Sequence, residues 1–369
     1  MYRSGSKSPM IRFWCCAIAA TALSLGAAPA LQSRPTIAVP HFIADPQWLR
    51  MPPDLVYGEV SAVDVDKQDR VWVLQRPRSA KPGPGQHAAP PVMVFAPDGT
   101  YLRGFGGPGT GYDWPANEHS LAVDAVGRVW ITGNSRSDPR AADDVLLTFD
   151  STGRFLREIG RPGATKGDDD TANLSAAADI FVDLPHRDVY VADGYGNRRV
   201  IVFDSETGAF KRMWSAFGAV PPPLPAPATR AAGIPATPET GDGPPGFNGV
   251  HGVELSRDGM VYVSDRNNRR IQVFTRAGRY LRQVFIDRND AAPNTASGMA
   301  LSADPAQRYL YVADFGNSRV LILDRPTLAV IGAIDGSFNG PHLIASDSSG
   351  NLYVAEVPGR SLKRFRLAR

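Results

Sequence analysis

The chain reads VYVADGYGNRRVIVF over residues 189–203. Two later stretches repeat this plan: VYVSDRNNRRIQVF at residues 261–274 and LYVADFGNSRVLIL at residues 310–323. Each begins with a short apolar run around an aromatic–valine pair, turns through a polar segment led by Asp, and continues into a second apolar run. Such runs, bounded by polar turns, are typical of short antiparallel strands. The recurrence of one plan along the chain predicts a repeat architecture.

When the rest of the chain is compared with these stretches, the same unit is found six times. Each copy joins a first apolar strand, through a turn with Asp or Gly, to a second strand that carries the aromatic pair. These strand pairs occupy residues 61–73, 119–131, 178–191, 251–263, 297–312 and 342–354. A third strand follows most copies, and turns such as Pro97–Gly99 lead to a fourth. Four short antiparallel strands repeated six times predict an all-β, six-bladed β-propeller, and the Asp-led turns resemble those of NHL repeats.

The first thirty residues differ from the rest of the chain. Three basic residues precede an apolar run, Phe13–Ala28, and Ala28–Ala30 has the small-x-small pattern that signal peptidases cleave. The run is shorter than the about 20 residues that span a membrane. We therefore interpret residues 1–30 as a signal peptide and residues 31–369 as one propeller, secreted or periplasmic, without a stable membrane span after cleavage. An uncleaved N-terminal anchor is the alternative.

Without this leader the composition changes. Cys15 and Cys16 both lie in it, so the mature chain has no disulfide, which favours a bacterial periplasm or exterior. The leader also holds three of the 40 basic residues and none of the 37 acidic ones, which leaves 37 of each. This neutral balance argues against nucleic acid as a partner. A Pro-, Ala- and Gly-rich segment, 217–246, and residues 78–90 are expected to be inserted loops.

Three of the six histidines occupy the same position of the repeat. His119, His251 and His342 each lie eight residues before a glycine and eleven before the aromatic residue of the second strand. They belong to the second, fourth and sixth copies. The equivalent positions in the other copies hold small residues: Ser61, Ala178 and Ser297. The remaining histidines, His41, His87 and His186, show no such register and are interpreted as surface residues.

This register predicts a metal site. The position is the first residue of the innermost strand, which lines the propeller's channel, and alternate blades are related by roughly threefold symmetry. Three imidazoles would therefore converge with small side chains between them. Three histidine ligands with an open fourth position are typical of catalytic zinc, although copper, nickel, cobalt and iron also accept imidazole. Ordinary packing histidines are the alternative.

Residues just after the second strand are expected on the same face as the histidines. Arg76, Tyr195 and Arg266 follow the second strands of the first, third and fourth copies, and Phe315 and Val357 follow those of the fifth and sixth. Two arginines beside a metal favour a carboxylate-bearing substrate, and a tyrosine there can serve as a base. The alternative is that Arg76 and Arg266 form ion pairs between blades. We expect that structural role for Arg199, Arg269, Arg270 and Arg319.

These residues resemble the peptidyl-α-hydroxyglycine α-amidating lyases over nearly all of the mature chain. Val191–Val200 is similar to the family's tyrosine segment, and Val250-His251 and Pro341-His342 are similar to its ligand segments. The resemblance implies a zinc held by His119, His251 and His342, with Tyr195 as the catalytic base. It also implies catalytic and substrate-binding roles for Arg76 and Arg266. The implied reaction cleaves an N-acyl carbinolamide to a primary amide and glyoxylate.

The chain departs from that family at three points. Leu343 stands where the family has an acidic calcium ligand, which argues against calcium. The family's disulfides are missing, and so is a copper monooxygenase domain. The substrate is therefore expected to be a peptide C-terminus or a small carboxylate such as ureidoglycolate.

Two other classes of protein compete with the lyase interpretation. A non-enzymatic NHL-repeat propeller would bind protein or another ligand on one face and would need no metal. A propeller lactonase would need Glu, Asn and Asp in register along the axis, and the sequence has no such register.

Overall fold

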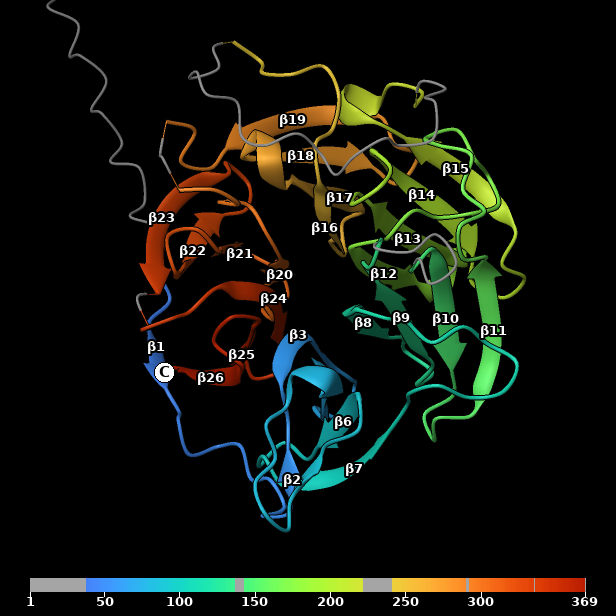
Figure 1. Cartoon of the computed structure of the whole chain (residues 1–369). Helices are drawn as coiled ribbons and strands as arrows, with labels where there is room; N and C mark the ends of the chain where they lie inside the picture. The colour runs from blue at the N-terminus through green and yellow to red at the C-terminus, as the bar shows by residue number, and fades with distance from the viewer. Residues whose placement is uncertain (1–37, 137–142, 222–240, 290–291, 335, 369) are drawn as a thin grey trace, which may run out of the picture. The chain divides into compact units, whose positions relative to one another are not determined.

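Six four-stranded antiparallel sheets stand around a common channel (Figure 1). This computed structural model describes residues 38–136, 143–221, 241–289, 292–334 and 336–368. Its strands confirm the predicted all-β, six-bladed β-propeller within the unit Ile37–Arg369. The predicted signal peptide lies outside the described residues. Within the described part, no helix has the length and apolar character needed to cross a bilayer.

Each blade runs from an innermost strand at the channel to an outermost strand at the rim. From inside to outside, the strands of the first three blades are β3 (Glu59–Val65), β4 (Val71–Arg76), β6 (Val92–Phe95), β7 (Tyr101–Phe105); β8 (Glu118–Val123), β9 (Val129–Gly133), β10 (Val145–Phe149), β11 (Phe155–Gly160); and β12 (Asp179–Asp183), β13 (Asp188–Asp193), β14 (Arg199–Asp204), β15 (Phe210–Trp214). Those of the last three are β16 (Val250–Leu255), β17 (Met260–Asp265), β18 (Arg270–Thr275), β19 (Tyr280–Phe285); β20 (Met299–Leu301), β21 (Tyr309–Asp314), β22 (Arg319–Asp324), β23 (Ala329–Ile334); and β24 (Pro341–Ser346), β25 (Leu352–Glu356), β26 (Ser361–Leu367), β1 (Phe42–Ala44).

The turn between the first and second strands explains why the aromatic residue recurs. In the second blade, the Asp124 carboxylate accepts the backbone N–H groups of Val126 (3.0 Å) and Arg128 (2.9 Å) and the indole N–H of Trp130 (3.2 Å). Asp66 in the first blade and Asp347 in the sixth make equivalent contacts. One buried carboxylate thus closes the turn and orients the aromatic ring of the next strand.

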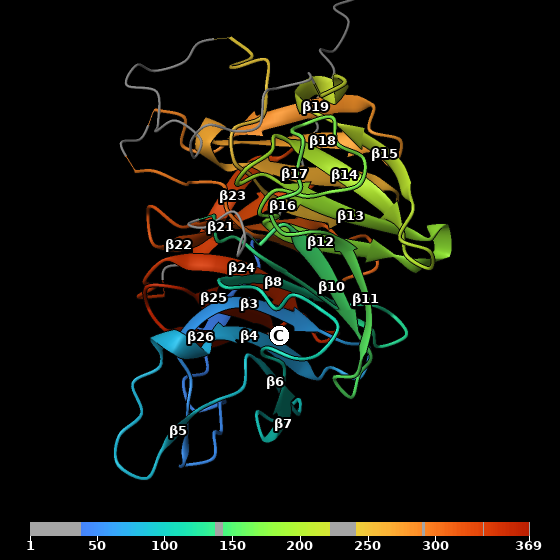
Figure 2. The same cartoon turned by 45° about the vertical axis from the view of Figure 1, so that its right-hand side comes forward.

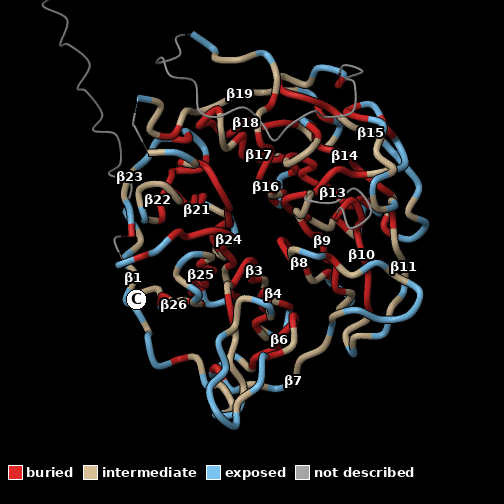
Figure 3. Tube along the Cα trace, in the orientation of Figure 1, coloured by how far each residue is buried: buried red, intermediate tan, exposed pale blue. Residues whose placement is uncertain are grey.

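The apolar core is divided among the blade interfaces. Six clusters of buried residues are present, and each joins the sheets of two neighbouring blades. Figure 3 shows this burial along the inner strands, whereas exposed segments lie toward the outside. Because no blade buries its faces alone, the ring is stable only when it is complete.

Strand β1 completes the ring. It pairs antiparallel with β26, matching Phe42 with Leu367, and so places an N-terminal strand at the outer edge of the last blade. This pairing covers the exposed edge of β26. The sequence pattern did not predict it, because three residues are too few for a period-2 signal.

The two predicted insertions differ in structure. Within residues 78–90, the strand β5 (His87–Ala88) pairs in parallel with β2 (Leu55–Val56), so this loop is partly ordered by a small sheet. Figure 2 shows β5 and its loop projecting from the first blade. The Pro-rich segment begins with a short 3₁₀ turn, Ala216–Gly218, and residues 222–240 lie outside the described part.

Candidate metal centre

Each of the three in-register histidines lies at an irregularity of an inner strand. His119, His251 and His342 are the second residues of β8, β16 and β24, not the first as predicted. At each one the pairing with the neighbouring strand shifts register, so that the histidine is skipped in the ladder. Bulges of this kind redirect a side chain. In this propeller they accompany three rings that converge on the channel.

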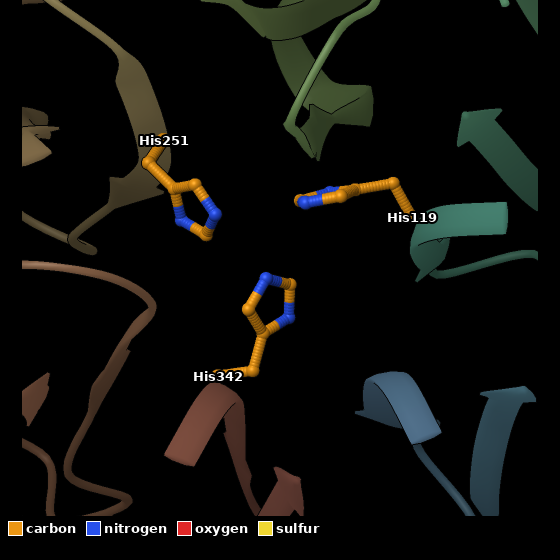
Figure 4. Close-up of side chains that lie close together, drawn as sticks. All are labelled: His119, His251 and His342. Carbon is orange, nitrogen blue, oxygen red and sulfur yellow. The ribbon is translucent and has the colours of Figure 1, made fainter. Parts of the chain in front are cut away.

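The rings meet at one point inside the propeller (Figure 4). Their centroids are 4.7 Å apart for His119 and His342, 4.8 Å for His251 and His342, and 5.2 Å for His119 and His251. One nitrogen from each ring lies within 4.8 Å of the others, and the three side chains are buried. Separations of this size are compatible with three histidine ligands of one ion.

Backbone carbonyls select the tautomer of two of the rings. His119 Nδ1 donates to the Ala178 carbonyl at 2.7 Å, and His342 Nδ1 donates to the Ser61 carbonyl at 2.6 Å. A carbonyl oxygen can only accept, so Nδ1 carries the proton and Nε2 keeps its lone pair. Ala178 and Ser61 are the small residues at the equivalent positions of the next blades. They therefore orient the two histidines as well as leave room for them.

His251 is the exception. Neither of its buried ring nitrogens has a hydrogen-bond partner of normal geometry within the described residues. The Ser297 carbonyl nevertheless lies close enough to favour the charged form of the ring. A buried imidazole without partners is costly, and a metal bound to Nε2 would satisfy it.

The environment keeps all three rings neutral. Burial lowers the pKa of His342 to about 3, with further lowering by Arg76 and Arg266. Burial likewise holds the pKa values of His119 and His251 well below the usual 6.5, assisted by His342 and Arg266 respectively. Neutral imidazoles are the form that binds metal, so the residues present fit a three-histidine site.

Tyr195 lies directly beside the histidines. Its hydroxyl donates to His119 Nε2 at 2.9 Å, and its ring centroid is 4.9 Å from that of His119. Arg266 Nη1 donates to the same phenol oxygen at 3.2 Å, and its guanidinium lies 5.2 Å from the centroid of the tyrosine ring. The structure therefore brings together the predicted base, one predicted arginine and the three predicted metal ligands.

The turn between β13 and β14 holds Tyr195 in place. The Asp193 carboxylate accepts the Ser175 N–H at 2.9 Å and Arg199 Nε at 3.0 Å. A Cβ added to Gly194 would lie only 1.9 Å from the carbonyl oxygen of Val250, the residue before His251. Glycine at this position lets the tyrosine turn pack directly on the strand that carries His251.

The two predicted substrate-binding arginines differ in their partners. Arg76 Nη1 forms an ion pair with Glu59 at 2.8 Å, and its Nε donates to the Glu118 carbonyl of the next blade at 3.0 Å. Among the described residues, no carboxylate lies within ion-pair distance of Arg266. Arg266 is therefore the better placed of the two to bind a substrate carboxylate. Sequence reasoning missed Glu59, which lies two residues before Ser61.

The arginines that begin the third strands have a structural role, but mainly within blades rather than between them. Arg199, Arg270 and Arg319 pair with Asp193, Asp265 and Asp314 of the neighbouring strand in the same blade. Arg319 also pairs with Asp287, which follows the last strand of the fourth blade, so this one ion pair joins two blades as predicted. Arg199 and Arg270 also donate to carbonyls of the loop that enters their blade. Arg269 instead donates to the Asp287 and Arg288 carbonyls.

The remaining predictions concern residues outside this cluster. His41, His87 and His186 are exposed, in agreement with their interpretation as surface residues. Leu343 packs into the apolar cluster between the first and second blades and offers no ligand for calcium.

The comparisons with known proteins agree with this architecture. A model of the NHL repeat matches residues 247–274, which run from the start of the fourth blade into β18. The fold and this match define the chain as a six-bladed β-propeller with an NHL repeat. Its relatives include NHL repeat-containing protein 3 of Mus musculus, 27% identical over 289 residues, and of Homo sapiens, 25% identical over 287 residues. Both alignments cover 75% of this chain and 72% of the relative.

Enzymes are found among the more distant similarities. Peptidyl-glycine alpha-amidating monooxygenase of Mus musculus is 23% identical over 68% of this chain, which spans 23% of that protein. Form B from Xenopus laevis is 25% identical over 67% of this chain and 26% of its own length. A catalytically inactive variant of virginiamycin B lyase from Staphylococcus aureus, solved with quinupristin, has a TM-score of 0.50 at 15% identity, covering 88% of this chain and 85% of its own. That structural likeness supports the fold alone.

Proposed function

We propose that this protein is a metal-dependent lyase that cleaves an N-acyl α-hydroxyglycine-type carbinolamide to a primary amide and glyoxylate. The observation that carries the proposal is the convergence of three neutral imidazoles beside the Tyr195 hydroxyl and the Arg266 guanidinium. The distant similarity to the peptidyl-glycine alpha-amidating monooxygenases supports the same reaction class.

The metal would be held by the Nε2 atoms of His119, His251 and His342, and zinc is the favoured ion. At His119 it would take the place of the hydrogen bond from the Tyr195 hydroxyl. Such an ion acidifies a nearby hydroxyl and stabilises the negative charge that develops on its oxygen. The chain's own residues supply the rest. Arg266 binds the substrate carboxylate and so orients the carbinol carbon toward the histidines.

Tyr195 transfers the proton. In this mechanism Tyr195 first gives up its own hydroxyl proton to solvent. The phenoxide then removes the proton of the carbinol hydroxyl, and the O–H electron pair becomes the second bond of the aldehyde carbonyl of glyoxylate. The C–N bond breaks, its electron pair stays on the amide nitrogen, and the proton is returned there. Arg266 donates to the same phenol oxygen, so it stabilises charge on that oxygen during the transfer.

The test is glyoxylate release from N-benzoyl-α-hydroxyglycine by the purified protein, together with its metal content. We expect about one zinc per chain and one glyoxylate per benzamide formed. A protein that holds its metal fully but releases no glyoxylate from any carbinolamide would contradict the proposed reaction.

A binding propeller without catalytic activity is the second candidate. It is favoured by the NHL repeat-containing protein 3 relatives, which are more similar to this chain than the monooxygenases cited above. This candidate predicts that the protein takes up no metal even after zinc is added.

Export is a further part of the proposal. If residues 1–30 are a cleaved signal peptide, mass spectrometry of the protein from the periplasm or medium will find Leu31 at the N terminus. A mature chain that still begins at Met1 would contradict cleavage.

A further inference from the structure

The mouth of the channel is chemically divided. At the ends of the second strands lie Arg76, the last residue of β4, in the first blade, Asn134 after β9 in the second, the Gly194–Tyr195 turn after β13 in the third and Arg266 after β17 in the fourth. In the fifth and sixth blades, β21 and β25 are instead followed by Phe315 and by Val357-Pro358. Polar and charged groups therefore cover four blades, and apolar groups cover the other two.

The apolar groups lie against the segment that carries a metal ligand. A Cβ added to Gly340 would lie 2.6 Å from Pro358 Cδ and 2.9 Å from Phe315 Cε2. Gly340 is two residues before His342, and its φ of +69° also favours glycine. The Gly359 N–H donates to the Asn339 carbonyl at 3.0 Å and fixes the turn that holds Pro358. The rings of Phe315 and Pro358 therefore lie beside the segment that leads into β24.

These three side chains do not pack in the apolar core clusters. Phe315 and Val357 are only partly buried, Pro358 is exposed, and none of them belongs to the apolar clusters found among the described residues. An aromatic ring at the mouth of a channel, outside any core cluster, offers apolar surface to a ligand.

We propose that Phe315, with Val357 and Pro358, forms the subsite for the acyl group of the substrate, which makes the substrate class N-acyl α-hydroxyglycines with an apolar acyl group. This inference rests on the proposed function. With the carboxylate bound by Arg266 and the carbinol at the histidines, the apolar side chains among the described ends of the second strands lie over the fifth and sixth blades. Over the other blades it would desolvate Tyr195, Asn134 or Arg76 without compensation.

The experiment separates binding from turnover. Isothermal titration of the zinc-loaded protein with N-benzoylglycine and N-acetylglycine, which lack the reactive hydroxyl, reports the acyl preference without chemistry. Glyoxylate release from the two corresponding α-hydroxy compounds reports it with chemistry. We expect the benzoyl compounds to be favoured by roughly tenfold or more in Kd and in kcat/KM, because the ring leaves water.

Substitution of the aromatic residue locates the subsite. Phe315→Ala is expected to reduce the benzoyl preference to within about threefold while N-acetyl values and metal content stay unchanged. Phe315→Leu, which keeps apolar volume in case the alanine variant does not fold, should retain part of the preference. Phe210→Ala, which removes an exposed phenylalanine on β15, is the matched control and should retain all of it.

The outcomes are distinct. Equal affinity for both acyl groups in the wild type, or a preference that survives both substitutions of Phe315, overturns the subsite. A benzoyl preference that Phe315 controls, without glyoxylate release, supports the subsite and overturns the proposed reaction.

Discussion

The inner strands of the propeller present two opposite kinds of titratable group to the channel. At one end of the channel, three buried imidazoles converge near Arg76 and Arg266. Toward the other end, Asp64, Asp179 and Glu254 line a cavity of about 380 Å³. Burial acts on both sets, but in opposite directions on the pKa values.

At the carboxylate end, burial raises the pKa of Asp64 to about 7 and that of Asp179 to about 6. It holds the pKa of Glu254 well above its usual 4.5, with Asp179 and Asp64 adding to the effect. Two of these groups tie blades together: Asp64 accepts the Val123 N–H at 2.7 Å, and Asp179 accepts the Val253 N–H at 3.0 Å.

Burial thus favours the neutral form at both ends, and the consequences differ. A neutral histidine keeps a lone pair that can bind a metal, whereas a neutral carboxyl group keeps a proton. Among the described residues, the histidines are the one group of potential ligands found to converge. The histidine end therefore holds the candidate metal ligands, whereas the carboxylate end contributes hydrogen bonds between blades.

The largest expected effect is the loss of a histidine ligand. His251→Ala removes the ring whose nitrogens have no hydrogen-bond partner of normal geometry among the described residues. Zinc content should therefore fall from about one per chain to near zero, and kcat/KM by at least about a thousandfold. Circular dichroism should show an intact propeller. His87→Ala, at an exposed position, is the control, and a His251→Ala protein that keeps a full equivalent of zinc would show that the site is misplaced.

Removal of the Tyr195 hydroxyl should have the next largest effect. Tyr195→Phe keeps the ring that packs on His119 but removes the proton-transfer group, so kcat should fall roughly a hundredfold or more. Zinc content should stay at the wild-type level, measured on the same sample. An unchanged kcat would assign the proton transfer to another group.

Substitution of Arg266 should affect substrate binding, whereas substitution of Arg76 should affect stability. Arg266→Met should raise KM by roughly tenfold to a hundredfold, because a charge-assisted pair with the carboxylate is lost. Arg76→Met leaves Glu59 and the Glu118 carbonyl without their donor, so the free energy of unfolding should fall by about 1–3 kcal/mol. Steady-state kinetics and urea unfolding of both variants test this. If Arg76→Met raises KM at unchanged stability, Arg76 also contacts substrate.

The smallest effect concerns pH and the carboxylate end. The folded pKa of Asp64 lies above its unfolded value of 3.8, so its contribution to stability is present at low pH and is lost as pH rises through about 7. Asp64→Asn lacks this titration. The Tm of the variant minus that of the wild type should therefore increase by about 3 °C from pH 5 to pH 8.

The control for this pH effect is an exposed carboxylate. The pKa of Asp98 is lowered, chiefly by the Thr100 N–H, so the side chain is ionised in both states above pH 5. Asp98→Asn should show no such increase. If the Tm of Asp64→Asn minus that of the wild type also stays constant from pH 5 to pH 8, Asp64 does not hold a proton in the folded state near neutral pH.

The predictable parts of the site are residues that occupy equivalent positions in different copies of the repeat. The position of His119, His251 and His342 in the unit predicted their convergence, and the end of the second strand predicted where Tyr195 and Arg266 lie. Equivalent positions in a closed ring are related by rotation, so a shared sequence position becomes a shared place in space.

By itself, the sequence determined the strand order within each unit, the number of blades and the histidine register. These follow from local alternation and turn chemistry, which act over a few residues. Only the tertiary structure decided that β1 closes the ring, that bulges redirect the histidines, and that Glu59 pairs with Arg76 while Arg266 has no carboxylate partner among the described residues. These features depend on pairing between strands and on contacts between blades, and such contacts leave no periodic signal in the chain.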